Sequence, residues 1–426
     1  MKASDIRQAV EEQEKMRRDR LGMERDALRE IVCEDGFATI VTGVRRCGKS
    51  TLLNQWSEKS RTRAVCVNFD DLRMSAFETS DFAVLDSVVR EMGVDTLILD
   101  EVQDVPEWER FVTGCLDAGR RVLVTGSNAK MLSRELGTKL TGRHLNTELY
   151  PFSYSEFLCF TKAAPSPASL EKYVVIGGFP AYVRTRRREV LEALFNDIIY
   201  RDIVVRYRLR DPAPVRSLAA YLLGHVGSRV SPTRLKDAMH VNSASTLLEY
   251  FSYFEETYLV RRLPRFASSP KAQMSYPKKI YTCDTGLVTA LAPRDGSDKG
   301  HKLENLVYLK LVRDGGTLSY FADDAGGTEC DFIQEMRDGT VRAVQVAWTL
   351  SAENEKREID GAIRAMERFG LNESVLVTHS QSDLVNVGGR TVKVVPAHEY
   401  LSLAPRRRSR RAITRERATS TSTAER

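Results

Sequence analysis

The residues with the clearest chemical meaning lie between Phe37 and Leu53, where an apolar run, a glycine-rich loop and a helix-forming stretch follow one another. The loop matches the pattern G-x-x-x-x-G-K-[ST], in which backbone N–H groups converge on phosphate oxygens, the lysine reaches the β- and γ-phosphates and the hydroxyl ligates Mg²⁺. A plain glycine turn is the alternative, and the full match in the expected place disfavours it. We expect ATP and Mg²⁺ to bind to Gly43, Val44, Arg45, Arg46, Cys47, Gly48, Lys49, Ser50 and Thr51.

Two adjacent carboxylates follow about fifty residues later. The apolar run Thr96–Leu99 ends in Asp100 and Glu101. A buried strand here would deliver both side chains to the sheet edge where parallel sheets bind ligands. Asp100 is then placed to hold Mg²⁺ together with Ser50, and Glu101 is placed to orient and deprotonate the attacking water. An apolar run before two acidic residues is common, so this assignment depends on the loop upstream.

Two further positions are candidates for contact with the γ-phosphate. A strand expected over Arg121–Thr125 leads into Gly126, Ser127 and Asn128. A polar side chain at the end of this strand can lie between the two acidic residues, so Ser127 and Asn128 both remain candidates for this sensing role. Either residue would also suit a helix N-cap, and the two roles are compatible. Arg143 precedes the last expected strand and could stabilise charge on the phosphoryl group, in cis or toward a neighbouring subunit, with a solvated arginine as the alternative.

Six segments, in this order, resemble prokaryotic AAA+-type ATP-binding proteins with a C-terminal domain of unknown function: GVRRCGKSTLL, LILDEVQDVPEWERFV, VLVTGSNAKML, LTGRHLNTELYPFSYSEFL, GGFPAYV and RDIVVRYRLRD. The resemblance covers about residues 30–400. It implies an α/β fold with a P-loop NTPase parallel sheet, a helical lid, a winged-helix-like segment and a C-terminal α/β restriction-endonuclease-like domain. It also places the Walker A motif at Lys49 and Ser50, the Walker B motif at Asp100 and Glu101, a sensor at Ser127–Asn128 and an arginine finger at Arg143.

The length of 426 residues favours two to four domains, with additional terminal segments. We expect a charged helix over 1–30, the ATPase core over 31–162, the lid over 163–212, the winged-helix-like segment over 213–266, the nuclease-like domain over 267–403 and a disordered basic tail over 404–426. Within the lid, a second sensor has four candidates, Arg184, Arg186, Arg187 and Arg188, and a solvated basic face is the alternative. Asn242 or Ser243 is expected to cap the third helix of the winged-helix-like segment.

The net charge of +6 comes from the tail. From Pro405 onward there are eight arginines and two glutamates, which leaves 56 basic and 56 acidic residues in the rest of the chain. Such a tail can bind DNA or another polyanion without sequence preference, and a solvated tail without a partner is the alternative. The third helix of the winged-helix-like segment is acidic and would repel phosphate, since it carries Glu249, Glu255 and Glu256.

The C-terminal part shows an incomplete endonuclease pattern. Glu304 in a helical stretch and Asp331 in a strand resemble two carboxylates that hold Mg²⁺ in such enzymes. The E-x-K positions on the next strand are instead Gln345, Val346 and Ala347. An amide is a poor Mg²⁺ ligand and alanine supplies no ammonium. The sequence therefore disfavours cleavage and favours a scaffold or a nucleic-acid-holding role.

No apolar run approaches the roughly 18 residues of a membrane span, and the N-terminus is too charged for a secretory signal. The seven cysteines are scattered without a C-x-x-C pair, which indicates reduced thiols. We therefore expect a cytoplasmic AAA+-type ATPase that turns over slowly and whose nucleotide state controls its C-terminal domains. Its expected partners are a protein client and further copies of the chain. The alternatives are a DNA-binding protein with an ATP-gated degenerate nuclease module and a nucleotide-bound scaffold.

Overall fold

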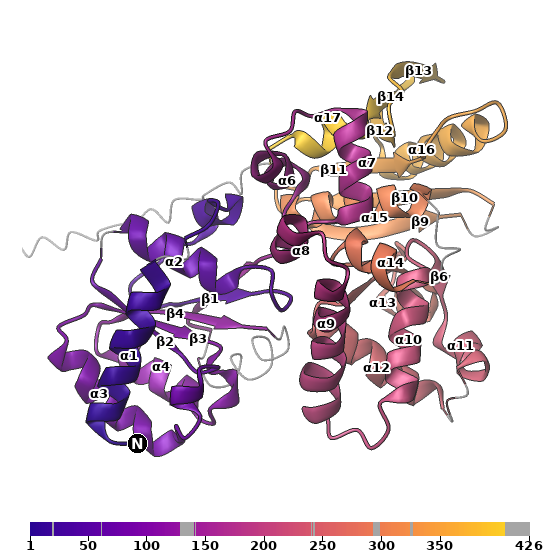
Figure 1. Cartoon of the computed structure of the whole chain (residues 1–426). Helices are drawn as coiled ribbons and strands as arrows, with labels where there is room; N and C mark the ends of the chain where they lie inside the picture. The colour runs from indigo at the N-terminus through magenta and orange to yellow at the C-terminus, as the bar shows by residue number, and fades with distance from the viewer. Residues whose placement is uncertain are drawn as a thin grey trace, which may run out of the picture.

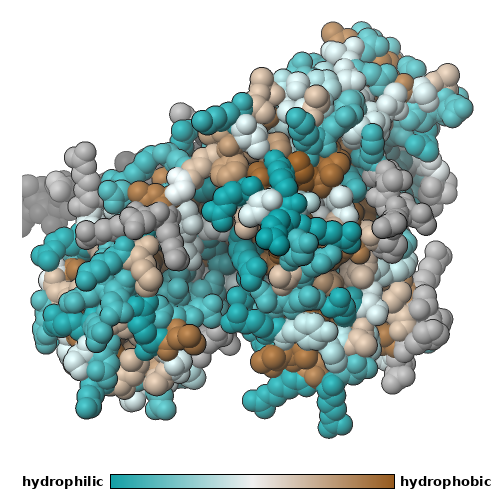
Figure 2. Space-filling view, viewed as in Figure 1, coloured by the Kyte–Doolittle hydropathy of each residue, from teal (hydrophilic) through white to brown (hydrophobic). Residues whose placement is uncertain are grey.

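The structure is a computed structural model of the chain. It describes residues 1–18, 21–60, 62–127, 140, 142–239, 241, 243–292, 299–323 and 327–404. The chain forms an N-terminal lobe around one sheet and a second lobe that holds two further sheets (Figure 1). Side chains of the two lobes meet in the centre of this view, and most of the described surface on this face is hydrophilic (Figure 2).

The N-terminal lobe is built on a parallel sheet with the strand order β2-β3-β4-β1-β5. The three apolar runs expected as strands form β1, β3 and β4, and nearly every residue in them is buried. Because β3, β4 and β1 are neighbours, the segments that follow these strands meet at one edge of the sheet. The strands are β1 (Ala38–Thr42), β2 (Ala64–Asn68), β3 (Thr96–Asp100), β4 (Arg121–Gly126) and β5 (His144–Glu148).

Alternation of side chains along the strands gives the sheet two apolar faces. Leu97 and Leu99 of β3 pack in one cluster with α1, α3 and α4, while Ile98 faces the cluster that contains α2. Ile6 and Val10 of α1 are buried there, so the N-terminal helix lies on the core. The helices are α1 (Ala3–Arg18), α2 (Lys49–Ser60), α3 (Phe82–Glu91) and α4 (Trp108–Asp117), with 3-10 turns η1 (Asp26–Glu30), η2 (Leu72–Met74), η3 (Thr79–Asp81) and η4 (Val102–Asp104).

A buried arginine from the N-terminal segment supports the loop between β1 and α2. The Nη1 of Arg25 donates to the carbonyl of Cys47 at 2.8 Å and its Nη2 to the carbonyl of Tyr150 at 2.7 Å. Its Nε donates to Glu156 Oε1 at 2.8 Å, which forms a buried ion pair. A Cβ on Gly48 would lie 3.2 Å from the same guanidinium. Arg25 therefore fixes the loop against the chain that follows β5.

The segment expected to form one lid is divided between two cores. Tyr173 of α7 packs with Tyr154 and Phe157 of α6 and with the C-terminal sheet, because these large aromatic side chains find their apolar surface there. The helices α9 and η6 pack instead with α10 and α12. The elements are α6 (Tyr154–Thr161), α7 (Pro167–Ile176), α8 (Pro180–Thr185), α9 (Glu189–Asp197) and the π-helical η6 (Ile198–Val205).

A helical segment and a small antiparallel sheet with the order β6-β8-β7 follow. Ser243 accepts a hydrogen bond from the Thr246 amide and caps α12, whereas Asn242 lies outside the described residues. The strand β8 lies beyond the boundary expected at residue 266, and it belongs to this unit because it pairs with both β6 and β7. The elements are α10 (Ala213–Gly224), β6 (Arg229–Val230), α11 (Pro232–Ala238), α12 (Ala244–Glu256), β7 (Val260–Leu263), α13 (Pro270–Ser275) and β8 (Lys278–Thr282).

The C-terminal sheet has the order β13-β14-β12-β11-β10-β9 and mixes antiparallel with parallel pairs. Its core joins α15 and α17 to the aromatic residues of α6 and α7. Among the helices that the structure describes, none has the length and apolar character to cross a membrane. The elements are α14 (Thr285–Leu291), α15 (Lys299–Asp314), β9 (Thr317–Ala322), β10 (Glu329–Glu335), β11 (Val341–Val346), α16 (Glu355–Phe369), β12 (Glu373–Thr378), β13 (Asp383–Val387), β14 (Arg390–Pro396) and α17 (Ala397–Ser402).

The buried ion pair between Arg25 and Glu156 makes the stability of the protein depend on Arg25. Arg25→Met leaves the Glu156 carboxylate buried without its cation, so we expect the free energy of unfolding to fall by about 3–5 kcal/mol. Urea unfolding followed by tryptophan fluorescence measures this, with the exposed Arg29→Met as control. Equal stability of the two variants would contradict the role given to Arg25.

The same pair predicts a pH dependence. Burial would raise the pKa of Glu156, but the Arg25 guanidinium and the amides of Ser153 and Asp26 outweigh it and lower the pKa below the usual 4.5. A carboxyl group whose pKa is lower in the folded than in the unfolded protein stabilises the fold at pH values above its unfolded pKa. This contribution is lost as the pH falls through the folded pKa. The stability difference between the wild type and Arg25→Met should therefore shrink below about pH 4.5. A constant difference from pH 7 to pH 3 would refute this linkage.

Candidate functional site

The loop between β1 and α2 has the conformation that its glycines permit. Gly43 has φ +148°, and a Cβ there would lie 2.0 Å from the carbonyl oxygen of Leu149. Gly48 has φ +104° and directly precedes the first residue of α2. Of the other expected loop residues, Val44 and Cys47 are buried in the core below the loop, and Thr51 lies in the first turn of α2. Backbone N–H groups and a helix N-terminus thus meet where phosphates are expected.

Lys49 points back into its own loop. Its Nζ donates to the carbonyl oxygens of Gly43 at 3.2 Å and Val44 at 3.4 Å. The same nitrogen lies 3.5 Å from Glu101 Oε1. The side chain is buried, so the ammonium is shared among groups that surround the phosphate position.

Thr125 joins the two acidic residues and was missed from the sequence. Its Oγ1 donates to Asp100 Oδ1 at 2.5 Å and accepts from the amide of Glu101 at 3.0 Å. A polar side chain was expected between these carboxylates, with Ser127 and Asn128 as candidates. Thr125, which lies earlier in the chain and within β4, occupies that position. Ser127 is buried and its Oγ has no hydrogen-bond partner among the described residues. Asn128 lies outside the described residues.

Charge and burial shift the pKa values of the two carboxylates in opposite directions. Burial and the nearby Glu101 charge raise the pKa of Asp100, and hydrogen bonds from Thr125 and Ser50 oppose that rise. Burial acts in the same direction on Glu101, but Lys49 and the Gln103 amide outweigh it, so the pKa of Glu101 lies below its usual value. Ser50 and Asp100 present adjacent hydroxyl and carboxylate oxygens, which fit the ligand preference of Mg²⁺.

The two arginines of the loop pair with carboxylates of the helical segment. Arg45 donates from Nε and Nη2 to both carboxylate oxygens of Asp202, at 3.0 and 2.7 Å. Arg46 donates from Nη2 to Asp197 at 2.6 Å. Asp197 ends α9 and Asp202 lies in η6. The phosphate-binding loop is therefore tied to this helix by two ion pairs.

Arg143 lies at the N-terminal ends of the strands, opposite the ends that lead into the loop. Its carbonyl accepts from the amide of Ala38 at the start of β1, and its Nη1 pairs with Asp117 at 2.8 Å. The loop begins after the five residues of β1, about 15 Å away at the rise of an extended strand. The same chain does not bring Arg143 to the other site residues. In the lid segment, Arg187 and Arg188 pair with Glu189 and Glu192 on an exposed helix surface.

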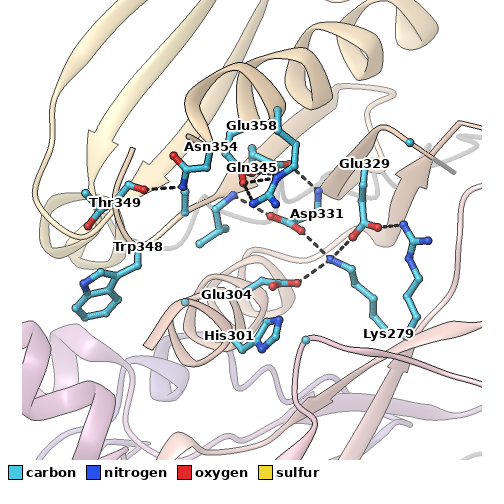
Figure 3. Close-up of a pocket in the computed structure, with 17 residues that line it drawn as sticks. Lys279, His301, Glu304, Glu329, Asp331, Gln345, Trp348, Thr349, Asn354 and Glu358 are labelled. Atoms are coloured by element: carbon cyan, nitrogen blue, oxygen red, sulfur yellow. Dashed lines mark hydrogen bonds and ion pairs between the residues drawn. The ribbon is translucent and has the colours of Figure 1, made fainter. Parts of the chain in front are cut away.

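A second polar cluster lies in the second lobe and contains the residues of the incomplete endonuclease pattern (Figure 3). Glu304 of α15 and Asp331 of β10 are brought together, and the Asp331 amide donates to Gln345 Oε1 at 3.0 Å. Val346 donates its amide to Asp331 Oδ2 at 2.9 Å, and Ala347 lines the same cavity of about 620 Å³. Between the carboxylates lies Lys279 of β8, which the sequence search missed because it precedes the motif by 25 residues. No group of three His, Cys, Asp or Glu side chains is arranged to hold a metal ion in the described ranges.

Comparison with known proteins places the site in a class. Residues 35–158 match the AAA domain family, and residues 167–298 match a domain of unknown function, DUF8612. An uncharacterized protein of Haemophilus influenzae is 26% identical over 387 residues, which cover 86% of this chain and 94% of that protein. The uncharacterized protein MJ1544 of Methanocaldococcus jannaschii is 29% identical over 356 residues, covering 78% and 79%. The Walker-type ATPase PABY2304 of Pyrococcus abyssi aligns with a TM-score of 0.40 at 16% identity, covering 62% and 93%.

The chain thus carries an AAA-type P-loop NTPase domain, as the order of motifs predicted. The match to the domain of unknown function covers residues 167–298, from α7 to α14, and overlaps the domain of unknown function expected over 267–403 only at residues 267–298. Together the match and the loop geometry support an ATP-binding protein of AAA type.

Thr125 gives a prediction at this site. Thr125→Val removes the hydroxyl that holds Asp100 and the backbone of Glu101 but keeps the shape of the side chain. We expect ATP turnover to fall about 10- to 100-fold, since hydrogen bonds to charged groups contribute about 1.5–3 kcal/mol, while ATP affinity changes little. Thr125→Ser, which keeps the hydroxyl, serves as control, and a fully active Thr125→Val enzyme would remove Thr125 from the site.

Proposed function

We propose that the protein is a slow Mg²⁺-dependent ATPase whose nucleotide state controls its C-terminal half. The observation that carries this proposal is that three kinds of group meet beyond the ends of neighbouring strands. These are an ammonium, a hydroxyl and carboxylate that could together bind Mg²⁺, and one further carboxylate. These groups belong to Lys49, Ser50, Asp100 and Glu101, with Thr125 between the carboxylates.

In the proposed mechanism ATP enters the loop and Lys49 moves from the Gly43 and Val44 carbonyls to the β- and γ-phosphates. This movement frees Glu101 from its cation and raises its proton affinity, so that it can orient water and accept a proton. Ser50 and Asp100 would hold Mg²⁺, which when bound neutralises charge on the phosphate oxygens. Thr125 keeps Asp100 and Glu101 in register throughout.

Slow turnover follows from the position of the arginines. An arginine that reaches the transferred phosphoryl group accelerates such reactions by about 10³–10⁵. Arg45 and Arg46 are held by carboxylates of the helical segment, and Arg143 pairs with Asp117 at the far edge of the sheet. A homo-oligomer in which a neighbouring copy supplies Arg143 would raise the rate, and we propose such an assembly as the faster state.

A chain of contacts supports control of the C-terminal half. Asp202 holds Arg45, and further along the same helical segment Tyr207 contacts Glu256 and stacks on Tyr253 of α12, with ring centroids 3.8 Å apart. A change at the phosphates that alters the Arg45–Asp202 pair would therefore reach α12. Whether a protein client or DNA responds depends on the surfaces beyond this helix.

We propose that residues 213–282 form a winged-helix-like unit and residues 299–396 a nuclease-like fold without cleavage activity. The order helix, strand, two helices, strand, short helix and strand supports the first, and the succession α15, β9, β10, β11, α16 and β12 supports the second. The cytoplasm is the proposed location, consistent with seven free cysteines that form no disulfide.

Two substitutions separate binding from turnover. Lys49→Ala removes the ammonium that contacts the phosphates, so ATP affinity should fall at least 10-fold in a folded protein. Glu101→Gln keeps the shape but accepts no proton, so ATP binding should persist while phosphate release falls about 100-fold or more. Calorimetry measures binding and a phosphate assay measures turnover. Wild-type turnover by Glu101→Gln would move the base to another residue.

The arginine-rich tail favours DNA as a second candidate partner. Truncation after Ala404 should abolish most DNA affinity and flatten its salt dependence, since each lost phosphate contact lowers the slope by about one. ATP turnover without DNA should stay unchanged, because the phosphate site lies in the N-terminal lobe. Steep salt dependence retained by the truncated protein would instead locate DNA binding on the folded body.

A further inference from the structure

The strongest feature outside the nucleotide site is Lys279 in the cavity of the second lobe. Lys279 belongs to β8 of the small sheet, yet its side chain points into the C-terminal domain (Figure 3). Its Nζ lies 2.6 Å from Glu329 Oε1, 2.7 Å from Asp331 Oδ1 and 2.9 Å from Glu304 Oε1. The residue is 3% exposed. One buried ammonium is therefore surrounded by three carboxylates from α15 and β10.

Two further side chains contact these carboxylates. Glu329 also pairs with Arg229, and Glu304 Oε1 accepts from the Tyr281 hydroxyl at 2.6 Å. Burial would lower the pKa of Lys279, but Asp331 and Glu304 outweigh it and raise the pKa, so the side chain is a cation at neutral pH. Lys279 and Tyr281 both come from β8, and together they cover the carboxylates from the side of the small sheet.

Carboxylate oxygens are the ligands that divalent cations prefer, but with Lys279 between them these three side chains are not arranged to hold a metal ion. Here the central position is filled by an ammonium that arrives from another unit of the fold. A metal ion and Lys279 Nζ cannot occupy this position together, because both require the same oxygens.

We propose that Lys279 is the resident cation of this cavity, and that it takes the place of a divalent ion and locks the small sheet to the C-terminal sheet. The lock goes beyond the ATPase function and does not depend on it. It gives the Glu304–Asp331 pair a structural role in place of the catalytic one that its pattern suggests, and it makes β8 the element through which movement of the small sheet would reach the C-terminal domain.

The test uses the full chain without nucleotide, titrated with Mn²⁺ and followed by the electron paramagnetic resonance of the free ion. Lys279→Met removes the charge at similar length, and Lys278→Met is the matched control, since Lys278 is the neighbouring, less buried lysine of β8. We expect Lys279→Met to melt about 5–10 °C lower than the wild type, to bind one additional Mn²⁺ and to regain stability with it. Neither the wild type nor Lys278→Met should have an Mn²⁺ site that the Asp331→Asn substitution removes.

A wild-type protein with an Mn²⁺ site that Asp331→Asn abolishes would overturn the proposal, since the cavity would then accept a metal beside Lys279. A Lys279→Met protein that is as stable as the wild type and gains no Mn²⁺ site would overturn it as well. If Lys279→Met is insoluble, the Lys279→Met/Asp331→Asn double variant is compared with Asp331→Asn alone. We expect the double variant to be soluble, because it lacks one of the buried carboxylates that Lys279→Met leaves without a cation. A soluble Asp331→Asn protein beside an insoluble double variant would show that the two residues are not coupled.

Discussion

The control that we propose depends on one interaction above all, the bidentate ion pair between Arg45 and Asp202. It joins the phosphate-binding loop, the part of the N-terminal lobe that a nucleotide must contact, to η6 in the second lobe. Asp202 is 4% exposed at its side chain, so loss of the partner would leave a buried charge. In the proposed function, this pair connects nucleotide occupancy to the position of η6, beside the apolar contacts that Val44 and Cys47 of the loop share with the same core.

Two buried cations play comparable parts at the ends of this connection. Arg25 fixes the phosphate-binding loop from below through Glu156, and Lys279 fixes the small sheet against the C-terminal domain. Between them lie η6, α12 and β7, which pack in one apolar core. Each cation belongs to a different unit from the carboxylate that it satisfies, so the units are held together by specific charges as well as by apolar burial.

Local patterns in the sequence predicted the local structure well. The apolar runs before Gly43 and Asp100 formed parallel strands, and Gly43 and Gly48 have positive φ angles in the loop between β1 and α2. Thr125 was missed because it reads as the end of a buried strand, and its role depends on its strand lying beside β3. Lys279 was missed because the contact joins residues 52 positions apart in different sheets. Side-chain partners across units are set by packing, which short-range spacing does not encode.

Hydrogen–deuterium exchange with and without a non-hydrolysable ATP analogue tests most directly whether nucleotide state reaches the second lobe. The account predicts changed exchange in the loop at residues 43–51 and also in η6 and α12, with no change in either helix when the Arg45–Asp202 pair is absent in Asp202→Asn. Asp197→Asn, which breaks the more exposed pair with Arg46, should retain most of the effect. Changes confined to residues 43–51 and 96–101 in the wild type would contradict the proposed control of the C-terminal half.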